Sequence, residues 1–223
     1  MSAVLLMRLA GPMQSWGTQS RFSHRDTGLE PSKSGVIGLL CAAVGRPRGA
    51  PLDDLAALRM GLRVDRPGRM ARDFHTAQRV IRADASGLQE TVVSQRFYLA
   101  DADFLVGLEG APGWVGELDG ALRRPVWPLY LGRKAYVPGE PVPVGVVTGS
   151  LEQVLGHHPW QPRHPGEKCR ERLRLVLEVP FGTGEPRQDV PLSFAERRFT
   201  VRHVDAGRFI DPPPVAEEVQ PCT

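Results

Sequence analysis

Positively charged side chains that could bind a phosphate chain occur in three separate stretches of the sequence. These are Arg21, Arg25 and Lys33, then Arg79, Arg82 and Arg96, and then Arg133 and Lys134. A guanidinium group donates paired hydrogen bonds to phosphate oxygens, and bases stack on it or on rings such as Trp16 and Phe22. A sheet that brought these stretches together would form an RNA-binding groove. A solvated surface with scattered arginines is the alternative interpretation.

Metal-ligating residue types crowd into a polar loop between residues 156 and 168. The loop contains His157, His158 and His164, and Cys169 follows it. Zinc binds imidazole and thiolate groups, but the paired spacings of zinc motifs do not occur in this segment. The loop is also rich in proline, which favours a solvated surface loop, and we predict neither a metal site nor any cofactor.

Acid–base chemistry has weaker support. The sequence contains no nucleophile elbow, no paired-histidine zinc motif and no Walker loop. Metal-free RNA cleavage needs only a general base for a 2′-hydroxyl, and His24, His75, Lys33 and Lys134 could supply such groups. Their spacing is not diagnostic, and a lone histidine is more often structural or surface-exposed.

Composition limits the class of protein. The chain has 223 residues, of which 41% are hydrophobic and 24% charged, as in ordinary soluble globular proteins. No apolar run approaches the roughly 18 residues that span a bilayer, the N-terminus lacks signal-peptide features, and three cysteines are too few for a disulfide framework. We therefore expect a cytoplasmic protein that makes no membrane contact. The net charge of +3 permits a nucleic-acid partner, although a GC-rich genome would also enrich arginine.

The elements that must position these residues begin with a strand and a helix. Val4–Leu9 is apolar apart from Arg8 and is followed by glycine and proline, which predicts a strand. The spacing predicts a helix that starts after Ser32 or Ser34 and ends at Gly45. Lys33 and Ser34 at its start could bind an anion. Gly35 and Gly38 indicate either a close backbone or phosphate chain, or a helix that lies tight on a sheet.

The later elements complete an α+β pattern. We expect strands at residues 59–65, 70–77 and 103–109, an irregular or edge strand at 126–131, a helix at 112–123, and a long hairpin at about 76–96 that projects from the body. Without the hairpin the order resembles βαββαβ, a ferredoxin-like domain, which is also the architecture of RRM domains. Residues 136–145 are interpreted as a linker. We therefore expect a domain over 1–143 and a small, mostly β part over 144–223.

Several motifs resemble one known family. They are Arg8–Gly17, Pro31–Leu40, Asp73–Thr76, Tyr98–Phe104 and Tyr130–Lys134. These segments closely resemble the Cas-five family of type I-E CRISPR systems, which belongs to the RAMP superfamily and is similar to RRM domains in fold. The resemblance extends from the start of the chain to about Pro143 and is loose beyond that point.

The resemblance implies an RNA-binding role in a multi-subunit surveillance complex, Cascade, which acts in antiviral defence. The chain would hold the 5′ handle of the CRISPR RNA, and the hairpin would be the family's thumb. The expected neighbours are the backbone subunit and the large PAM-reading subunit, with indirect contact to target DNA. The expected RNA-binding residues are Gln14, Trp16, Arg21, Arg25, Lys33, Ser34, His75, Arg79, Arg82, Arg96, Arg133 and Lys134.

Catalysis is not expected from the resemblance, because a separate endoribonuclease cuts the repeat RNA in type I-E systems. In a related subtype, members of the family cut this RNA themselves. One departure from the type I-E pattern bears on this point. Ala135-Tyr136 follows Lys134 where the family has a small polar residue and a cysteine. A tyrosine, a lysine and a histidine are the kind of set that the cutting relatives use, so a metal-independent endoribonuclease is the alternative function.

Overall fold

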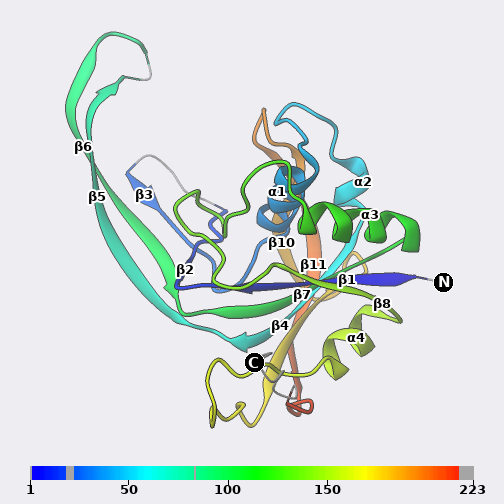
Figure 1. The fold of residues 1–223 in the computed structure, drawn as a ribbon. Helices are drawn as coiled ribbons and strands as arrows, with labels where there is room; N and C mark the ends of the chain where they lie inside the picture. The colour runs from blue at the N-terminus through cyan, green and yellow to red at the C-terminus, as the bar shows by residue number, and fades with distance from the viewer. Residues whose placement is uncertain (1, 19–22, 83, 216–223) are drawn as a thin grey trace.

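A seven-stranded antiparallel sheet forms the body of the protein in the computed structural model, which describes residues 2–18, 23–82 and 84–215 (Figure 1). Its strands are β1 (Ala3–Ala10), β4 (Arg59–Arg66), β7 (Asp103–Gly110), β8 (Pro143–Thr148), β9 (Leu173–Val179), β10 (Glu185–Ser193) and β11 (Arg198–Ile210). They follow the order β10-β11-β9-β4-β7-β1-β8, and each neighbouring pair is antiparallel.

Helices cover both faces of this sheet. The helices of the described residues are α1 (Lys33–Val44), α2 (Asp53–Ala56), α3 (Pro112–Arg123) and α4 (Leu151–His157). β1 places Leu5, Met7 and Leu9 in the core under α1 and α3, and it places Val4 and Leu6 in the core under α4. Because side chains alternate along a strand, β1 must be apolar on both sides. This explains the apolar run that predicted the strand, and the predicted α+β class is confirmed.

The two ends of α1 are those predicted from the sequence. The Ser32 hydroxyl accepts a hydrogen bond from the Gly35 backbone N–H at 3.2 Å, and Gly45 ends the helix with φ +70°. A Cβ atom at Gly35 would lie 2.8 Å from the indole of Trp16, so this glycine makes room for a buried ring. Gly38 has no such close neighbour, and its nearest contact would be Phe194 at 3.8 Å.

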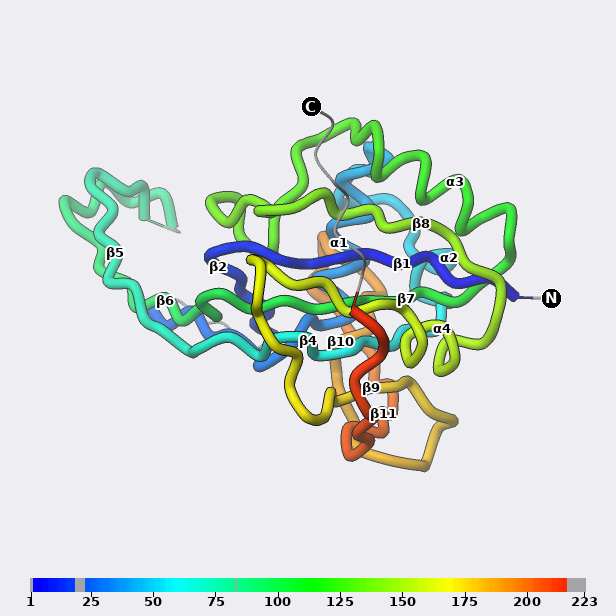
Figure 2. Tube along the Cα trace, turned by 60° about the horizontal axis from the view of Figure 1, so that its bottom comes forward, coloured from blue at the N-terminus to red at the C-terminus, as the bar shows by residue number. Residues whose placement is uncertain are grey.

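A second, smaller sheet carries the hairpin. The hairpin consists of β5 (Arg69–Ile81) and β6 (Leu88–Ala100), and it is longer than the predicted range of 76–96. Two short strands, β2 (Met13–Gln14) and β3 (His24–Arg25), pair with β6 near its base. Among the described residues, the distal half of the hairpin pairs only with itself, and it extends from the end of the body opposite to the N-terminus (Figures 1 and 2).

Residues 126–131 were predicted to be irregular or an edge strand, and they do not form an edge strand. This segment is irregular, and the backbone N–H groups of Val126 and Trp127 donate to the carbonyls of Ala43 and Ala42 at the end of α1. The edge strand is instead β8, which lies partly within the stretch interpreted as a linker. Proline is tolerated at the start of an edge strand, because its missing N–H then interrupts no ladder.

The proposed division after residue 143 does not coincide with a break in the sheet. It falls at the first residue of β8, which pairs with β1, while β9 pairs with β4 at the other side of the same sheet. The strands β9, β11 and β10 therefore extend the N-terminal sheet beyond β4 (Figure 2). None of the helices in the described part of the chain is long and apolar enough to cross a membrane.

Candidate RNA interface

The base of the hairpin brings together cations from segments that are far apart in the sequence. β3 runs parallel to β6, with His24 opposite Gln95 and Arg25 opposite Arg96. Register partners on neighbouring strands share a face, so Arg25 and Arg96 lie side by side. The Arg96 Nε–H donates to the Ser94 hydroxyl at 3.1 Å, which orients the guanidinium along that face.

A tight turn places a third arginine on this pair. Gly132 has φ +85°, and a Cβ atom there would lie 1.7 Å from the carbonyl oxygen of Ser15, so no other residue fits. The turn is fixed by the Ser15 N–H, which donates to the Leu131 carbonyl at 3.1 Å. This packing explains why the glycine directly precedes Arg133 and Lys134.

Arg133 spans the gap between the turn and β3. Its Nη2 donates to the backbone carbonyls of Arg25 and Asp26 at 3.1 and 3.2 Å, and its Nη1 donates to the Tyr136 hydroxyl at 3.0 Å. Lys134 follows as an exposed side chain. We call the four residues Arg25, Arg96, Arg133 and Lys134 the basic cluster.

Three residues that were predicted to contact RNA are buried, and they support the surface from inside the protein. The Gln14 amide donates to the carbonyls of Leu9 and Ala102 at 2.9 and 2.8 Å and accepts from the Trp16 indole N–H at 3.1 Å. Trp16 is 2% exposed. Lys33 is also 2% exposed, and we therefore leave all three out of the proposed RNA-contacting set.

The anion site expected at the start of α1 is occupied by the protein itself. The Lys33 backbone N–H donates to the Asp189 carboxylate at 2.8 Å, and the Lys33 ammonium binds Glu178 at 3.0 Å. Burial lowers the pKa of Lys33, while Glu178 acts in the opposite direction. Ser34 is half-buried, and its hydroxyl lies 3.3 Å from that of Ser32. A phosphate at this position would have to displace both carboxylates.

The remaining predicted residues lie along the hairpin or outside the described part of the chain. Arg79 and Arg82 are exposed in its distal half, and Arg79 has φ +51°. The register places Arg79 six residues beyond Asp73, the partner of Arg96, which corresponds to about 20 Å along the strand. These arginines therefore form no part of the basic cluster. His75 is exposed, and its Nδ1 lies 3.7 Å from the Asp73 carboxylate. Arg21 and Phe22 lie outside the described residues.

Two of the groups that the endoribonuclease alternative could use, His24 and His75, lie on opposite faces of the sheet. Gln95 is the register partner of both His24 and Phe74, so these two residues share one face of the sheet. His75 therefore lies on the opposite face from His24. Tyr136 is buried, and its hydroxyl accepts from Arg133.

The loop at residues 156–168 was predicted to hold no metal. Within the ranges that the structure describes, no group of three or more His, Cys, Asp or Glu side chains could hold a metal ion. His157 Nδ1 lies 2.8 Å from the Gln153 carbonyl, and burial lowers the pKa of His158. The loop instead binds the body through Glu167, whose carboxylate pairs with Arg66.

Sequence reasoning missed the carboxylates that neutralise many of the arginines. Glu30 is buried and pairs with both Arg174 and Arg187, which join the segment before α1 to β9 and β10. Arg8 is buried in β1 and donates to Asp103 at 2.7 Å. The only available signal was Arg8 itself, a charged residue inside an otherwise apolar strand.

Comparisons with known proteins agree with this architecture. Residues 4–205 match the family described as CRISPR-associated protein (Cas_Cas5). The Cascade subunit CasD of Escherichia coli strain K12 is 34% identical over 224 residues, which cover 90% of this chain and 96% of CasD. A crystal structure of a Cas protein matches with a TM-score of 0.76 and 44% identity, covering 96% of this chain and 98% of that one.

A chain of a CRISPR RNA-guided surveillance complex matches with a TM-score of 0.78 and 37% identity. This match covers 96% of the present chain and 91% of the other chain. Together with the family match over residues 4–205, it assigns the protein to a group that functions in antiviral CRISPR systems. The chain belongs to the Cas5 family of CRISPR-associated proteins, in the CasD branch of type I-E systems.

Proposed function

We propose that this chain is a non-catalytic RNA-binding subunit of a cytoplasmic Cascade complex and that it binds the 5′ handle of the CRISPR RNA. Its relative from Escherichia coli is a Cascade subunit, and a similar solved chain comes from an RNA-guided surveillance complex. The observation that carries the proposal is the convergence of the basic cluster at the base of the hairpin. Positively charged side chains from three segments of the chain meet there on one surface.

The basic cluster combines oriented and free cations. Arg133 uses three of its five N–H groups on protein acceptors, which leaves two for a ligand. Arg96 uses only its Nε–H. Arg25 and Lys134 have no hydrogen-bond or ion-pair partner for their side chains among the described residues. The oriented pair can set the position of a phosphate, and the free pair can adapt to the next one along the strand.

The ferredoxin-like arrangement of RRM domains is part of this proposal. The supporting observation is the sheet order β4-β7-β1-β8, with α1 between β1 and β4 and α3 between β7 and β8. That order corresponds to βαββαβ once the hairpin is set aside, because β5 and β6 are inserted between β4 and β7. The basic cluster lies where β3 pairs with β6, and Figure 1 shows these two strands at the end of the body from which the hairpin extends.

The hairpin is proposed to be the thumb that reaches the neighbouring backbone subunit, and the body is proposed to contact the large PAM-reading subunit. The distal half of the hairpin carries exposed apolar side chains, including Ile81 at 71% and Leu88 at 48%, which face each other in the register and pair with no other strand of the described residues. A two-stranded ribbon with little core of its own gains stability by docking. Target DNA would be reached only through the RNA and these neighbours.

Charge removal at the basic cluster tests the RNA-binding proposal. The double variant Arg25→Gln with Lys134→Gln should bind a handle RNA about tenfold more weakly than the wild type at 100 mM salt. Because this variant no longer neutralises two phosphates, the slope of log affinity against log salt should become shallower by about 1.4. Fluorescence anisotropy with labelled handle RNA measures both quantities.

The matched control is Arg79→Gln with Arg82→Gln, which removes the same charge about 20 Å away. Its effect on a short handle RNA should be small. Equal losses in the two double variants would show that the RNA senses only net charge, and the assignment of the cluster would then be abandoned.

The non-catalytic part of the proposal is tested with repeat RNA and pure protein in a chelator. We expect the RNA to remain intact over hours. Cleavage that disappears in His24→Gln, His75→Gln or Lys134→Gln would instead establish the metal-independent endoribonuclease.

A further inference from the structure

A cavity of about 330 Å³ lies at the base of the hairpin, on the side away from the basic cluster. Its walls come from the turn between β4 and β5, from Ala100 at the end of β6 and Asp101 after it, and from the loop at residues 160–170. β3 pairs with one edge of β6, and β5 pairs with the other edge. The cavity therefore lies beside β5, separated from the basic cluster by the width of the hairpin.

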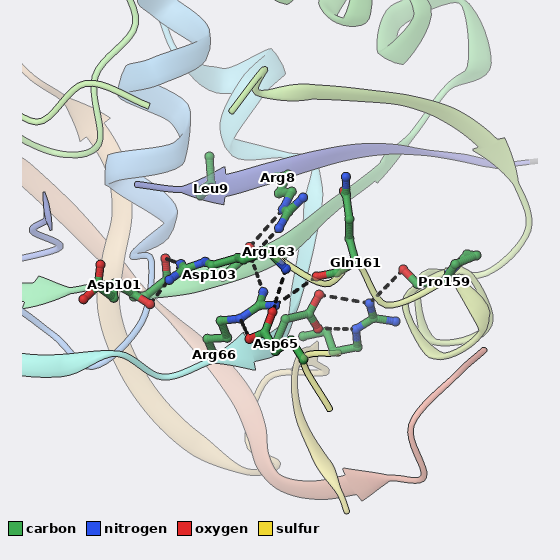
Figure 3. A network of polar contacts seen from close by, with 12 residues as sticks. Arg8, Leu9, Asp65, Arg66, Asp101, Asp103, Pro159, Gln161 and Arg163 are labelled. Atoms are coloured by element: carbon green, nitrogen blue, oxygen red, sulfur yellow. Dashed lines mark hydrogen bonds and ion pairs between the residues drawn. The ribbon is translucent and has the colours of Figure 1, made fainter. Parts of the chain in front are cut away.

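The cavity is built on a buried polar network (Figure 3). Arg66 donates to Asp103 at 2.6 Å and to Glu167 at 2.8 and 2.6 Å, and its guanidinium lies 4.7 Å from the centre of the Trp160 ring. Arg163 donates to the backbone carbonyls of Asp101 and Ala102 at 3.0 and 3.1 Å. These contacts tie the loop to both turns of the hairpin base, so the wall is a fixed part of the fold.

Two carboxylates of the wall are neutralised by arginines. Asp65 accepts from the buried Arg63 at 2.5 and 3.0 Å. Glu167 pairs with Arg66, which holds the pKa of this carboxyl well below its usual range, at about 2. Neither carboxylate is left to balance further positive charge in the cavity.

Three further cations line the same cavity without partners. All three are exposed, Arg69, Lys168 and Arg170, and none of their side chains has a hydrogen bond or ion pair with another of the described residues. Of the carboxylates that line the cavity, only that of Asp101 pairs with no arginine side chain among the described residues. The Arg163 guanidinium donates only to backbone carbonyls and adds a fourth cation, so three unbalanced positive charges remain in one concave, rigid place, which favours an anionic ligand.

We propose that this cavity binds a phosphodiester group of a nucleic-acid strand, at a site separate from the basic cluster. Arginine presents a planar fork to phosphate oxygens, and lysine adds an adaptable charge. The concave shape has room for a phosphate and part of its sugar. The phosphate comes either from a second strand paired with the RNA or from a more distant part of the same RNA.

The test uses the full chain and two probes, the handle RNA alone and the same RNA extended by a guide segment annealed to complementary DNA. The choice of RNA rests on the proposed function. The variant is Arg69→Gln with Arg170→Gln, which removes two exposed, unpaired charges and leaves the polar network intact. The matched control is Arg124→Gln with Arg197→Gln, two exposed arginines outside both sites.

The variant should bind the annealed probe about tenfold more weakly than the control does at 100 mM salt, with a slope of log affinity against log salt shallower by about 1.8. A loss confined to the annealed probe identifies a second strand as the source of the phosphate. An equal loss with RNA alone identifies the RNA itself. Affinities equal to those of the control for both probes would overturn the site, as would a wild type that binds neither probe. The Arg25→Gln with Lys134→Gln variant reports on the handle separately, so the two proposals can fail independently.

Discussion

Replacing Gly132 by alanine should misplace the basic cluster while the rest of the fold remains. The added Cβ would lie 1.7 Å from the Ser15 carbonyl oxygen, whereas ordinary contacts begin at about twice that distance, so the turn must move by more than 1 Å. A side chain at φ +85° costs a further 1–2 kcal/mol or so. Loss of the bond between Ser15 N–H and the Leu131 carbonyl adds about 1 kcal/mol.

The sum is about 2–3 kcal/mol, which is observed either as lower stability or as a displaced turn. In a chain of this size, 1 kcal/mol corresponds to about 2–4 °C in Tm. We therefore expect a Tm lowered by about 4–12 °C. We also expect affinity for handle RNA to fall more than in the Lys134→Gln variant, because Arg133 and Lys134 move together. Thermal unfolding by circular dichroism and anisotropy with handle RNA measure the two effects.

Gly116→Ala is the matched control. Gly116 lies on the exposed side of α3, where a Cβ atom would meet nothing within 4 Å, so alanine should stabilise the protein by about 0.5–1 kcal/mol. If Gly132→Ala matched this control in both stability and RNA affinity, the turn would not be what positions Arg133, and the reasoning from its packing would be refuted.

Two further predictions concern internal ion pairs. Lys33→Met should lower the free energy of unfolding by about 3 kcal/mol in urea titrations, because Glu178 loses its buried partner. The same variant should leave the salt dependence of RNA binding unchanged. A shallower slope of log affinity against log salt would instead show that Lys33 contacts phosphate. Glu167→Gln should cost about 1–2 kcal/mol at pH 7. Its folded pKa of about 2 lies below the unfolded value, so this stability is present above about pH 4.5 and is lost as the pH falls toward 2. A cost that is equal at pH 7 and pH 2.5 would contradict this linkage.

The parts of the fold that the sequence predicted are those specified by local patterns. The apolar run of β1, the cap at Ser32 and the left-handed residue Gly45 each act within a few positions, so the first strand and helix were predicted almost to their ends. Edge strand β8 was missed because its identity depends on pairing with β1, and prolines around it resemble a linker. Pairing partners more than 100 residues apart leave no local signal.

The candidate site was predicted in part for the same reason. Residue type selected the arginines as candidates for phosphate binding, but type does not distinguish a free guanidinium from one that a carboxylate neutralises. Arg25 and Arg133 meet only because β3 pairs with β6 and Gly132 packs on Ser15. Lys33 resembled them in sequence and proved to be internal, since Glu178 lies 145 positions away along the chain.

The positions of the carboxylates decide which cations are paired within the protein and which remain unpaired at its surface. The C-terminal strands supply Glu178 and Asp189, which engage Lys33 and Arg202, and they supply Arg174 and Arg187 to Glu30. These strands therefore neutralise the region around the start of α1 and leave unpaired positive charge near the base of the hairpin. A helix start that would otherwise attract phosphate is filled by Asp189, so an RNA strand has no competing site there. Asp189→Asn removes that carboxylate, and we expect it to raise nonspecific RNA binding at low salt. Unchanged binding would mean that the carboxylate at the start of α1 has no part in directing RNA to the hairpin base.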